Sequence, residues 1–178
     1  MKKYILCIGL LLQFHVNAQL ECDPLAPASM VGATQLGDGS PGSVTTNMIQ
    51  DALDLGGAIQ FNVGSSPVQI DLTETLLVTK GSSIDGGGLV TLSGQNALPI
   101  IRIENPDNIG FSFNIQNISL ENGFTATESG AAIYKPVSGD HLLIDLNVYN
   151  VNFENNHAIQ LSQDFGGGAI YAFGLNDI

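Results

Sequence analysis

A repeated pattern of apolar residues in the second half of the chain constrains the fold most strongly. The two copies lie 33 positions apart: Phe111, Phe113, Ile115, Asn117, Ile118 and Leu120, then Ile144, Leu146, Val148, Asn150, Val151 and Phe153. In both copies apolar and polar residues alternate up to an Asn and then shift phase by one. Such a shift turns later side chains to the opposite face of an extended chain. We therefore predict a bend at Asn117 and Asn150, where Asn suits a left-handed backbone.

A second signature follows each copy and completes the repeat. Gly130-Ala131-Ala132-Ile133-Tyr134 matches Gly167-Gly168-Ala169-Ile170-Tyr171, so the repeat is 33 to 37 residues long. Short strands and bends at this period are typical of a β-solenoid, in which equivalent strands of successive coils stack in parallel. The Asn residues at the bends would then form a ladder. An antiparallel sandwich with fortuitous similarity is the alternative, and the matched phase shifts favour the solenoid.

The segment before the repeat predicts a helix and then short strands. Ser43 has the character of an N-cap, and a helical stripe follows at Val44, Met48, Ala52 and Leu55. Gly56-Gly57 would end this helix. Alternating apolar residues then predict strands separated by Gly, Asn and Pro, at Ile59, Phe61, Val63, Val68, Ile70, Leu72, Leu76, Val78, Ile84, Val90, Leu92, Ile101 and Ile103.

These motifs, in this order, resemble right-handed parallel β-helix repeat proteins of pectate-lyase-like architecture. The residues that carry the resemblance are Gly37 to Ser43, Gly56 to Asn62, Ile84 to Gly88 and Val90 to Gly94. Phe153-Glu154-Asn155-Asn156 and Gly167 to Ile170 are similar to the FxxN and GGAI motifs of polymorphic outer-membrane-protein repeats. The first copy departs from them at Leu120, Gly123 and Ala131. The resemblance implies secreted, autotransported or outer-membrane adhesin-like proteins, or polysaccharide lyases.

The expected organisation has three parts within an all-β fold. Residues 1–18 are a signal peptide, 19–36 an extended lead-in, and 37–178 an N-terminal cap helix with the first coils of a right-handed parallel β-helix. The chain stops at Asn176-Asp177-Ile178, directly after a repeat signature. We therefore expect the N-terminal part of a longer protein, truncated at the C-terminus.

The first eighteen residues favour secretion. Lys2 and Lys3 precede an apolar run from Tyr4 to Phe14, and Val16-Asn17-Ala18 offers small residues at a cleavage site. The run is shorter than the ~20 residues that a membrane span requires. We expect a secreted, extracellular or cell-surface protein with no span in the mature chain. Cys22 would be its single cysteine, and its role stays open.

The net charge of the chain restricts the classes of molecule that it can bind. The chain carries 5 basic and 17 acidic residues, a net charge of −12. This surface repels phosphate backbones, so nucleic-acid binding is disfavoured. Glycans and host or cell-surface proteins remain candidate partners. No cofactor is expected, although a structural Ca²⁺ on a loop at Asp38 or Asp164 stays open.

The sequence contains no group of residues with the pattern of a catalytic site, so no catalytic, cofactor-binding or metal-binding residue is predicted. A lyase would need a base and clustered cations, and Lys80, Arg102 and Lys135 are scattered. A glycosidase needs paired carboxylates, which neighbouring coils could supply at Asp145 or Glu154. Isolated histidines, His141 and His157, make no zinc site.

Three further motifs have structural explanations that we favour. Asp85-Gly86-Gly87-Gly88 lacks the helix of a phosphate-binding loop and fits a tight bend. Asn117-Ile118-Ser119 is a glycosylation sequon, but Asn117 is also the proposed bend. Tyr134 and Tyr171 occupy equivalent positions and either stack as a ladder, which we prefer, or face outward as a sugar platform.

The sequence as a whole favours an adhesin-like binding module or a structural stalk over an enzyme. The alternative is a polysaccharide lyase or hydrolase of β-helix type whose active site lies in coils beyond this sequence.

Overall fold

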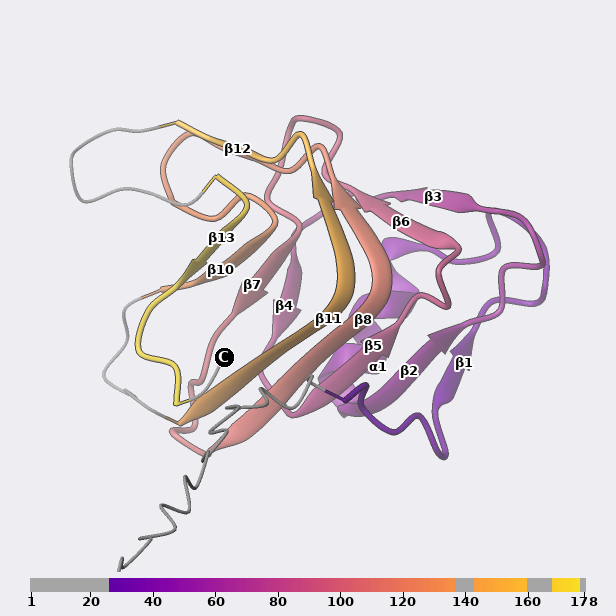
Figure 1. Cartoon of the computed structure of the whole chain (residues 1–178), viewed down its shortest axis with the longest axis horizontal. Coiled ribbons are helices and arrows are strands. Elements are labelled where there is room, and N and C mark those ends of the chain that lie inside the picture. Colours follow the sequence, from indigo (N-terminus) through magenta and orange to yellow (C-terminus); the bar gives the residue numbers. More distant parts are fainter. Residues whose placement is uncertain (1–25, 137–142, 160–167, 177–178) are drawn as a thin grey trace, which may run out of the picture.

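The computed structural model describes residues 26–136, 143–159 and 168–176. Within them the fold is mostly β, with one helix and strands that pair in parallel (Figure 1). The predicted signal peptide, Cys22, His141 and Asp164 lie outside the described residues.

Three parallel sheets curl around a shared interior, like part of a barrel (Figure 1). The largest contains β1 (Thr34–Leu36), β2 (Gly57–Phe61), β3 (Val68–Asp71), β5 (Ser82–Asp85), β6 (Val90–Ser93), β8 (Phe111–Glu121) and β11 (Ile144–Glu154). The second contains β4 (Leu76–Val78), β7 (Ile101–Ile103), β10 (Ile133–Lys135) and β13 (Ile170–Ala172). The third pairs β9 (Phe124–Thr125) with β12 (His157–Ala158). The predicted strands are therefore confirmed as parallel β structure, except that Val63 and Leu72 lie beyond the ends of β2 and β3.

The 33-residue repeat is confirmed by the pairing of β8 with β11. Phe113 lies opposite Leu146, and Ile118 lies opposite Val151, in a parallel register that runs the length of both strands. Asn117 and Asn150 have φ of 49° and 50°. This left-handed conformation bends each strand where the phase of the pattern shifts.

The bends divide the large sheet into two faces. Before Asn117, β8 continues the register of β2 and β5; after it, β8 continues the register of β3 and β6. The sheet of β4, β7, β10 and β13 supplies a third set of stacked strands. Inward side chains therefore form three apolar columns: Ile59–Ile84–Ile115, Ile70–Leu92–Leu120 and Leu76–Ile101–Ile133. Their burial supplies the main stabilisation of the fold.

A helix is present as predicted, but its first turn and its buried face differ from the prediction. Helix α1 spans Thr46–Leu55, and its N-cap is Thr45 rather than Ser43, with the Met48 N–H donating to Thr45 Oγ1. The Ser43 hydroxyl instead donates to the Ser40 carbonyl within the preceding turn. Leu55 was expected on the packed face and is 80% exposed.

The buried face of α1 is rotated about the helix axis relative to the predicted apolar stripe. Its buried residues are Thr46, Ile49, Ala52 and Leu53. Gly56 was correctly predicted to end the helix: its φ is 80°, and its N–H donates to the carbonyls of Ala52 and Leu53. Ala52 is shared by the predicted and observed faces, so the error is a rotation rather than a missing element.

Helix α1 closes one edge of the second sheet through side-chain hydrogen bonds. Gln50 Oε1 accepts from the Leu77 N–H at 2.8 Å, and Gln50 Nε2 donates to the Leu77 carbonyl at 3.0 Å. The amide thus takes the place of a neighbouring strand at β4. This arrangement satisfies backbone groups that an edge strand would otherwise leave unpaired.

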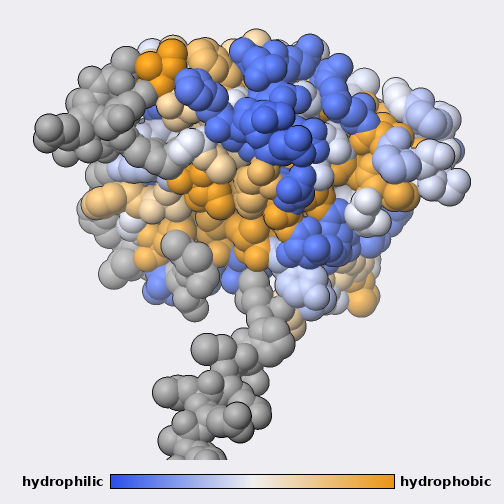
Figure 2. Space-filling model, turned by 45° about the horizontal axis from the view of Figure 1, so that its top comes forward, coloured by the Kyte–Doolittle hydropathy of each residue, from blue (hydrophilic) through white to orange (hydrophobic). Residues whose placement is uncertain are grey.

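Several large apolar side chains still reach the surface, and Figure 2 shows hydrophobic areas bordering hydrophilic ones. The most exposed among the described residues are Val31, Leu55, Ile109 and Phe173. They are dispersed along the sequence, as single exposed apolar residues are in most soluble folds.

Candidate functional site

The outward side chains of the second sheet form a column that joins charge to aromatic surface. In this sheet Arg102 of β7 lies between Leu77 of β4 and Tyr134 of β10, and Tyr134 lies beside Tyr171 of β13. Their neighbours along each strand point into the core, because side chains alternate across a strand. Arg102, Tyr134 and Tyr171 are therefore presented on the outside by a buried scaffold.

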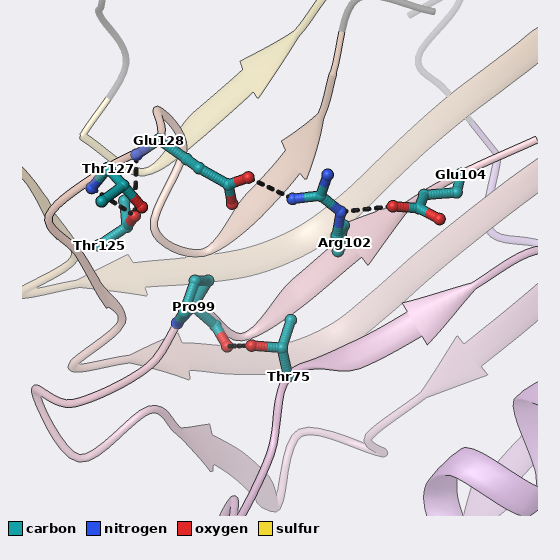
Figure 3. Close-up of polar contacts among 7 residues, drawn as sticks. All are labelled: Thr75, Pro99, Arg102, Glu104, Thr125, Thr127 and Glu128. Carbon is teal, nitrogen blue, oxygen red and sulfur yellow. Dashed lines mark hydrogen bonds and ion pairs between the residues drawn. The ribbon is translucent and has the colours of Figure 1, made fainter.

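Arg102 is held between two carboxylates (Figure 3). Its Nε donates to Glu104 Oε1 at 2.6 Å, and its Nη1 donates to Glu128 Oε1 at 2.5 Å. Partial burial acts to lower the pKa of Arg102, but the hydrogen bonds and charges of the two glutamates outweigh it and raise the pKa above its ordinary value. The guanidinium is consequently charged and fixed in orientation.

Tyr134 forms the aromatic part of the same column. The Arg102 guanidinium lies over its ring, 5.0 Å from the centroid, at the range of a cation–π contact. On the other side the Tyr171 ring centroid lies 5.8 Å away, with the planes tilted by 39°. Burial raises the pKa of Tyr134, and the negative charge of Glu128 raises it further.

A cleft of about 480 Å³ opens beside Arg102 and Tyr134. We call it the Arg102 cleft. Its lining residues are Thr75, Ala97, Pro99, Arg102, Phe124, Thr125, Ala126, Thr127, Glu128 and Tyr134. Aromatic rings, hydroxyls and an ion pair therefore share one concave surface, the composition that small polar ligands with apolar faces require.

The turn that carries Glu128 is organised by its own threonines. Thr125 Oγ1 accepts from the N–H groups of Thr127 and Glu128, at 3.4 Å and 3.1 Å (Figure 3). Below it, the Thr75 hydroxyl donates to the Pro99 carbonyl at 2.9 Å. The two bonds to Thr125 Oγ1 hold the turn that places Glu128 opposite Arg102 before any ligand arrives, which lowers the entropic cost of binding.

The second large groove of the surface has a different character. It measures about 540 Å³ and lies at the bends of β8 and β11, with Asn117, Ser119, Asn150 and Asn152 among its lining residues. The Asn150 side chain donates to Asn117 Oδ1 at 2.9 Å, and Asn117 donates to Asp85 Oδ1 at 3.1 Å. The predicted Asn ladder is confirmed. The amides already bond one another, so this groove is chiefly structural.

The structure brings some of the residues singled out in the sequence into contact. The rings of Tyr134 and Tyr171 lie side by side in register, tilted by 39°, in agreement with the preferred ladder. Their role as a sugar platform stays a prediction. Glu154 pairs in register with Glu121, and Asp145 pairs with Ser112, whose hydroxyl donates to it at 3.0 Å. His157 stacks on Phe124 with ring centroids 6.1 Å apart.

The three cations of the described chain do not converge. Lys80 Nζ donates to the Asp54 carbonyl at the end of α1, at 2.6 Å. Lys135 is 1% exposed, with its Nζ donating to the Pro136 carbonyl at 3.3 Å. Arg102 is paired with two glutamates. Within the described residues, the cation cluster that a uronate lyase needs is therefore not formed.

Sequence reasoning missed Glu104, Glu128 and Phe124 as members of a site. Glu128 lies 26 positions from Arg102, in a turn that shows no motif of its own. A partial signal did exist, because Arg102 is flanked by the apolar Ile101 and Ile103, which places it at an outward position of its strand. Tyr134 lies between Ile133 and Lys135 and lacks this pattern. Reading it needed the register between β7 and β10, which the repeat at residues 111–153 does not cover.

The remaining site predictions concern metals and membranes. Asp38 accepts hydrogen bonds from the Ser40 hydroxyl and N–H, and these bonds lower its pKa. No group of three or more His, Cys, Asp or Glu side chains able to hold a metal ion occurs among residues 26–136, 143–159 and 168–176. The same residues contain no helix that is long and apolar enough to cross a membrane.

Comparison of the chain with protein-family models, curated proteins and solved structures finds no match in any of the three. The geometry of the described residues therefore carries the functional argument.

Proposed function

We propose that this chain is a right-handed parallel β-helix, secreted or held at a cell surface, that acts as an adhesin-like binding module for glycans. The stacking of parallel strands on three faces and the 33-residue register support the solenoid. The apolar leader at residues 1–18 supports secretion. Coils of this kind present outward side chains in columns along the molecule.

The Arg102 cleft is the single observation that carries the binding role. A sugar has an apolar ring face and a rim of hydroxyls. Tyr134 and Phe124 offer aromatic surface for the ring face, while Glu128 and Arg102 offer hydrogen-bonding groups for the rim. A stalk needs no such concavity, because its outward residues serve only solubility.

The test is binding of the purified chain to immobilised glycans, compared with two tyrosine variants. Tyr134→Ala removes the aromatic wall of the Arg102 cleft and should weaken binding about tenfold, or about 1.4 kcal/mol. Tyr149→Ala on β11 is the matched control, since Tyr149 does not line the cleft, and it should bind as the unaltered chain does. Circular dichroism verifies that both variants fold.

Two outcomes would contradict the proposal. Failure to bind any glycan would favour the structural stalk. Release of new reducing or unsaturated ends from a bound polysaccharide would instead favour the enzyme alternative, in which the chain degrades the glycan it holds.

A further inference from the structure

The charges around the Arg102 cleft restrict the glycan it can take, an inference that rests on the proposed function. Arg102 is bonded to Glu104 and Glu128 at once. One positive and two negative charges leave this cluster with a net charge of −1. The guanidinium is therefore not available as a counter-charge for an anionic ligand unless a carboxylate is displaced.

The geometry makes that displacement costly. Figure 3 shows Glu104 and Glu128 approaching Arg102 from opposite sides. The side chains of Arg102 and Glu128 are 30% and 31% exposed, so both are partly withdrawn from water, where ion pairs are screened less than at an open surface. The N–H groups of Thr127 and Glu128 both donate to Thr125 Oγ1, which further fixes the turn that carries Glu128. A uronate or sulfate would have to compete with two carboxylates that are already in place.

No other cation of the described chain stands in for Arg102. Lys80 is engaged at the carboxyl end of α1, and Lys135 is buried at 1% exposure. The whole sequence carries −12. An anionic polysaccharide would thus approach against the field of the protein as well as that of the cleft.

We infer that the Arg102 cleft binds a neutral glycan, one without carboxylate or sulfate groups. Sugar hydroxyls donate to the free carboxylate oxygen of Glu128, which lines the cleft, and the apolar face of a ring lies on Tyr134 or Phe124. The ion pair sets specificity in two ways: it supplies acceptors for hydroxyl donors, and it repels anionic sugars.

The experiment titrates the purified chain with two sets of oligosaccharides. Neutral cello-, malto-, manno- and xylo-hexaose form the first set, and oligogalacturonate and heparin hexasaccharides form the second. The informative variant is Glu104→Gln/Glu128→Gln, which keeps the shape of the cleft and leaves Arg102 with an uncompensated charge. The matched control, Asp71→Asn/Glu121→Gln, removes the same charge from strands β3 and β8, outside the cleft.

The unaltered chain should bind at least one neutral oligosaccharide and prefer it over both anionic ones. The Glu104→Gln/Glu128→Gln variant should gain affinity for oligogalacturonate by about tenfold or more, since removal of two like charges is worth at least that factor at short range. The control should not gain it. Preference of the unaltered chain for an anionic hexasaccharide, lost in Tyr134→Ala, would overturn this inference and leave glycan binding standing. Absence of binding in every arm would overturn both.

Discussion

Strands β8 and β11 carry the same pattern of residues but have different surroundings. On β8 the inward side chains Ile115, Ile118 and Leu120 are 0%, 3% and 0% exposed. Their register partners on β11, Val148, Val151 and Phe153, are only partly buried. Among the described strands, β8 pairs with β5 and β6 on one side and β11 on the other, whereas β11 pairs with β8 alone.

The comparison teaches that these inward positions are buried by the neighbouring strands as much as by their own sequence. On β8, Ile115 and Leu120 each have a paired strand on both sides, and their side chains are fully buried. The equivalent residues of β11 are covered from one side. At the pairs Ile115–Val148, Ile118–Val151 and Leu120–Phe153, substitutions should therefore cost more on β8 than on β11, even when the β11 residue is larger.

The largest expected difference is between Leu120→Ala and Phe153→Ala. Leu120 lies between Leu92 and Phe153 and is fully buried, so its truncation should lower the free energy of unfolding by about 3 kcal/mol. Phe153→Ala removes more atoms but leaves a site open to water, and should cost about 1–2 kcal/mol. Urea titration of both variants measures the difference. A larger cost for Phe153→Ala would contradict the comparison.

A second difference concerns Gly123 and its register equivalent Asn156. A Cβ at Gly123 would lie 2.3 Å from the Ala131 carbonyl oxygen and 2.7 Å from Asn156 Oδ1. Gly123→Ala should therefore destabilise the fold by about 2 kcal/mol through overpacking. Asn156 has room for its side chain, which accepts from the Gly123 N–H and donates to the Leu120 carbonyl.

Asn156→Ala is the partner of that prediction. It should cost about 1 kcal/mol, the usual net value of the hydrogen bonds it removes. Thermal unfolding of both variants tests the order. Equal melting temperatures for Gly123→Ala and the unaltered chain would contradict the close packing around Gly123.

The bends give a third, smaller difference. Asn117 makes two side-chain hydrogen bonds: it donates to Asp85 and accepts from Asn150. Among the interactions observed, the side chain of Asn150 makes only the bond to Asn117. Replacing Asn117 with Ala should cost about 2 kcal/mol, from the left-handed backbone and the lost hydrogen bonds together, and Asn150→Ala about 1 kcal/mol.

Asn117→Gly separates the two causes. Glycine adopts the left-handed conformation freely, so this variant should recover the backbone part of the loss and keep the hydrogen-bond part. If Asn117→Gly were as unstable as Asn117→Ala, the bend would contribute nothing, and the ladder would account for the whole effect.

The smallest expected effect is a pH dependence at the foot of the ladder. Burial acts to raise the pKa of Asp85, but hydrogen bonds from Gln116, the Gly87 N–H and Asn117 outweigh it and lower the pKa below its ordinary value. A depressed carboxyl pKa adds stability above the pKa of the unfolded chain, about 3.9, which is lost as the pH falls through the lower folded value. The unaltered chain should therefore lose more stability between pH 5 and 2 than Asp85→Asn.

Chemical denaturation at a series of pH values measures that slope. Identical slopes for the two proteins would show that Asp85 is not held in its charged form by the ladder.

Sequence reasoning reached the β8–β11 register because the pattern there repeats without a gap. The left-handed Asn residues at 117 and 150 followed from the same phase shift. A second pair of left-handed corners, at Asn122 and Asn155, was missed. No phase shift in the apolar pattern marks these corners, because the turns they open lead directly to the short strands β9 and β12.

The N-cap of the helix and the Arg102 cleft could not be predicted from the sequence. Ser and Thr are both common N-cap residues, and here the Ser43 hydroxyl bonds to Ser40 while Thr45 caps the helix. The cleft depends on β7 and β10 lying side by side, with Glu128 held by a turn between distant strands. Tyr134 and Tyr171 were found as equivalent positions, but their charged partner lies in a segment that the repeat does not include.

The most direct test of the parallel 33-residue register is a disulfide between β8 and β11. With Cys7 and Cys22 replaced by Ser, the outward pair Ser119→Cys/Asn152→Cys lies in register, at a strand spacing of about 4.8 Å that a disulfide can bridge. Ser119→Cys/Glu154→Cys is offset by two residues, about 8 Å apart, and cannot be bridged without moving the backbone. Mild oxidation should cross-link the first pair rapidly and the second poorly. Efficient cross-linking of the offset pair alone would contradict the register on which this fold depends.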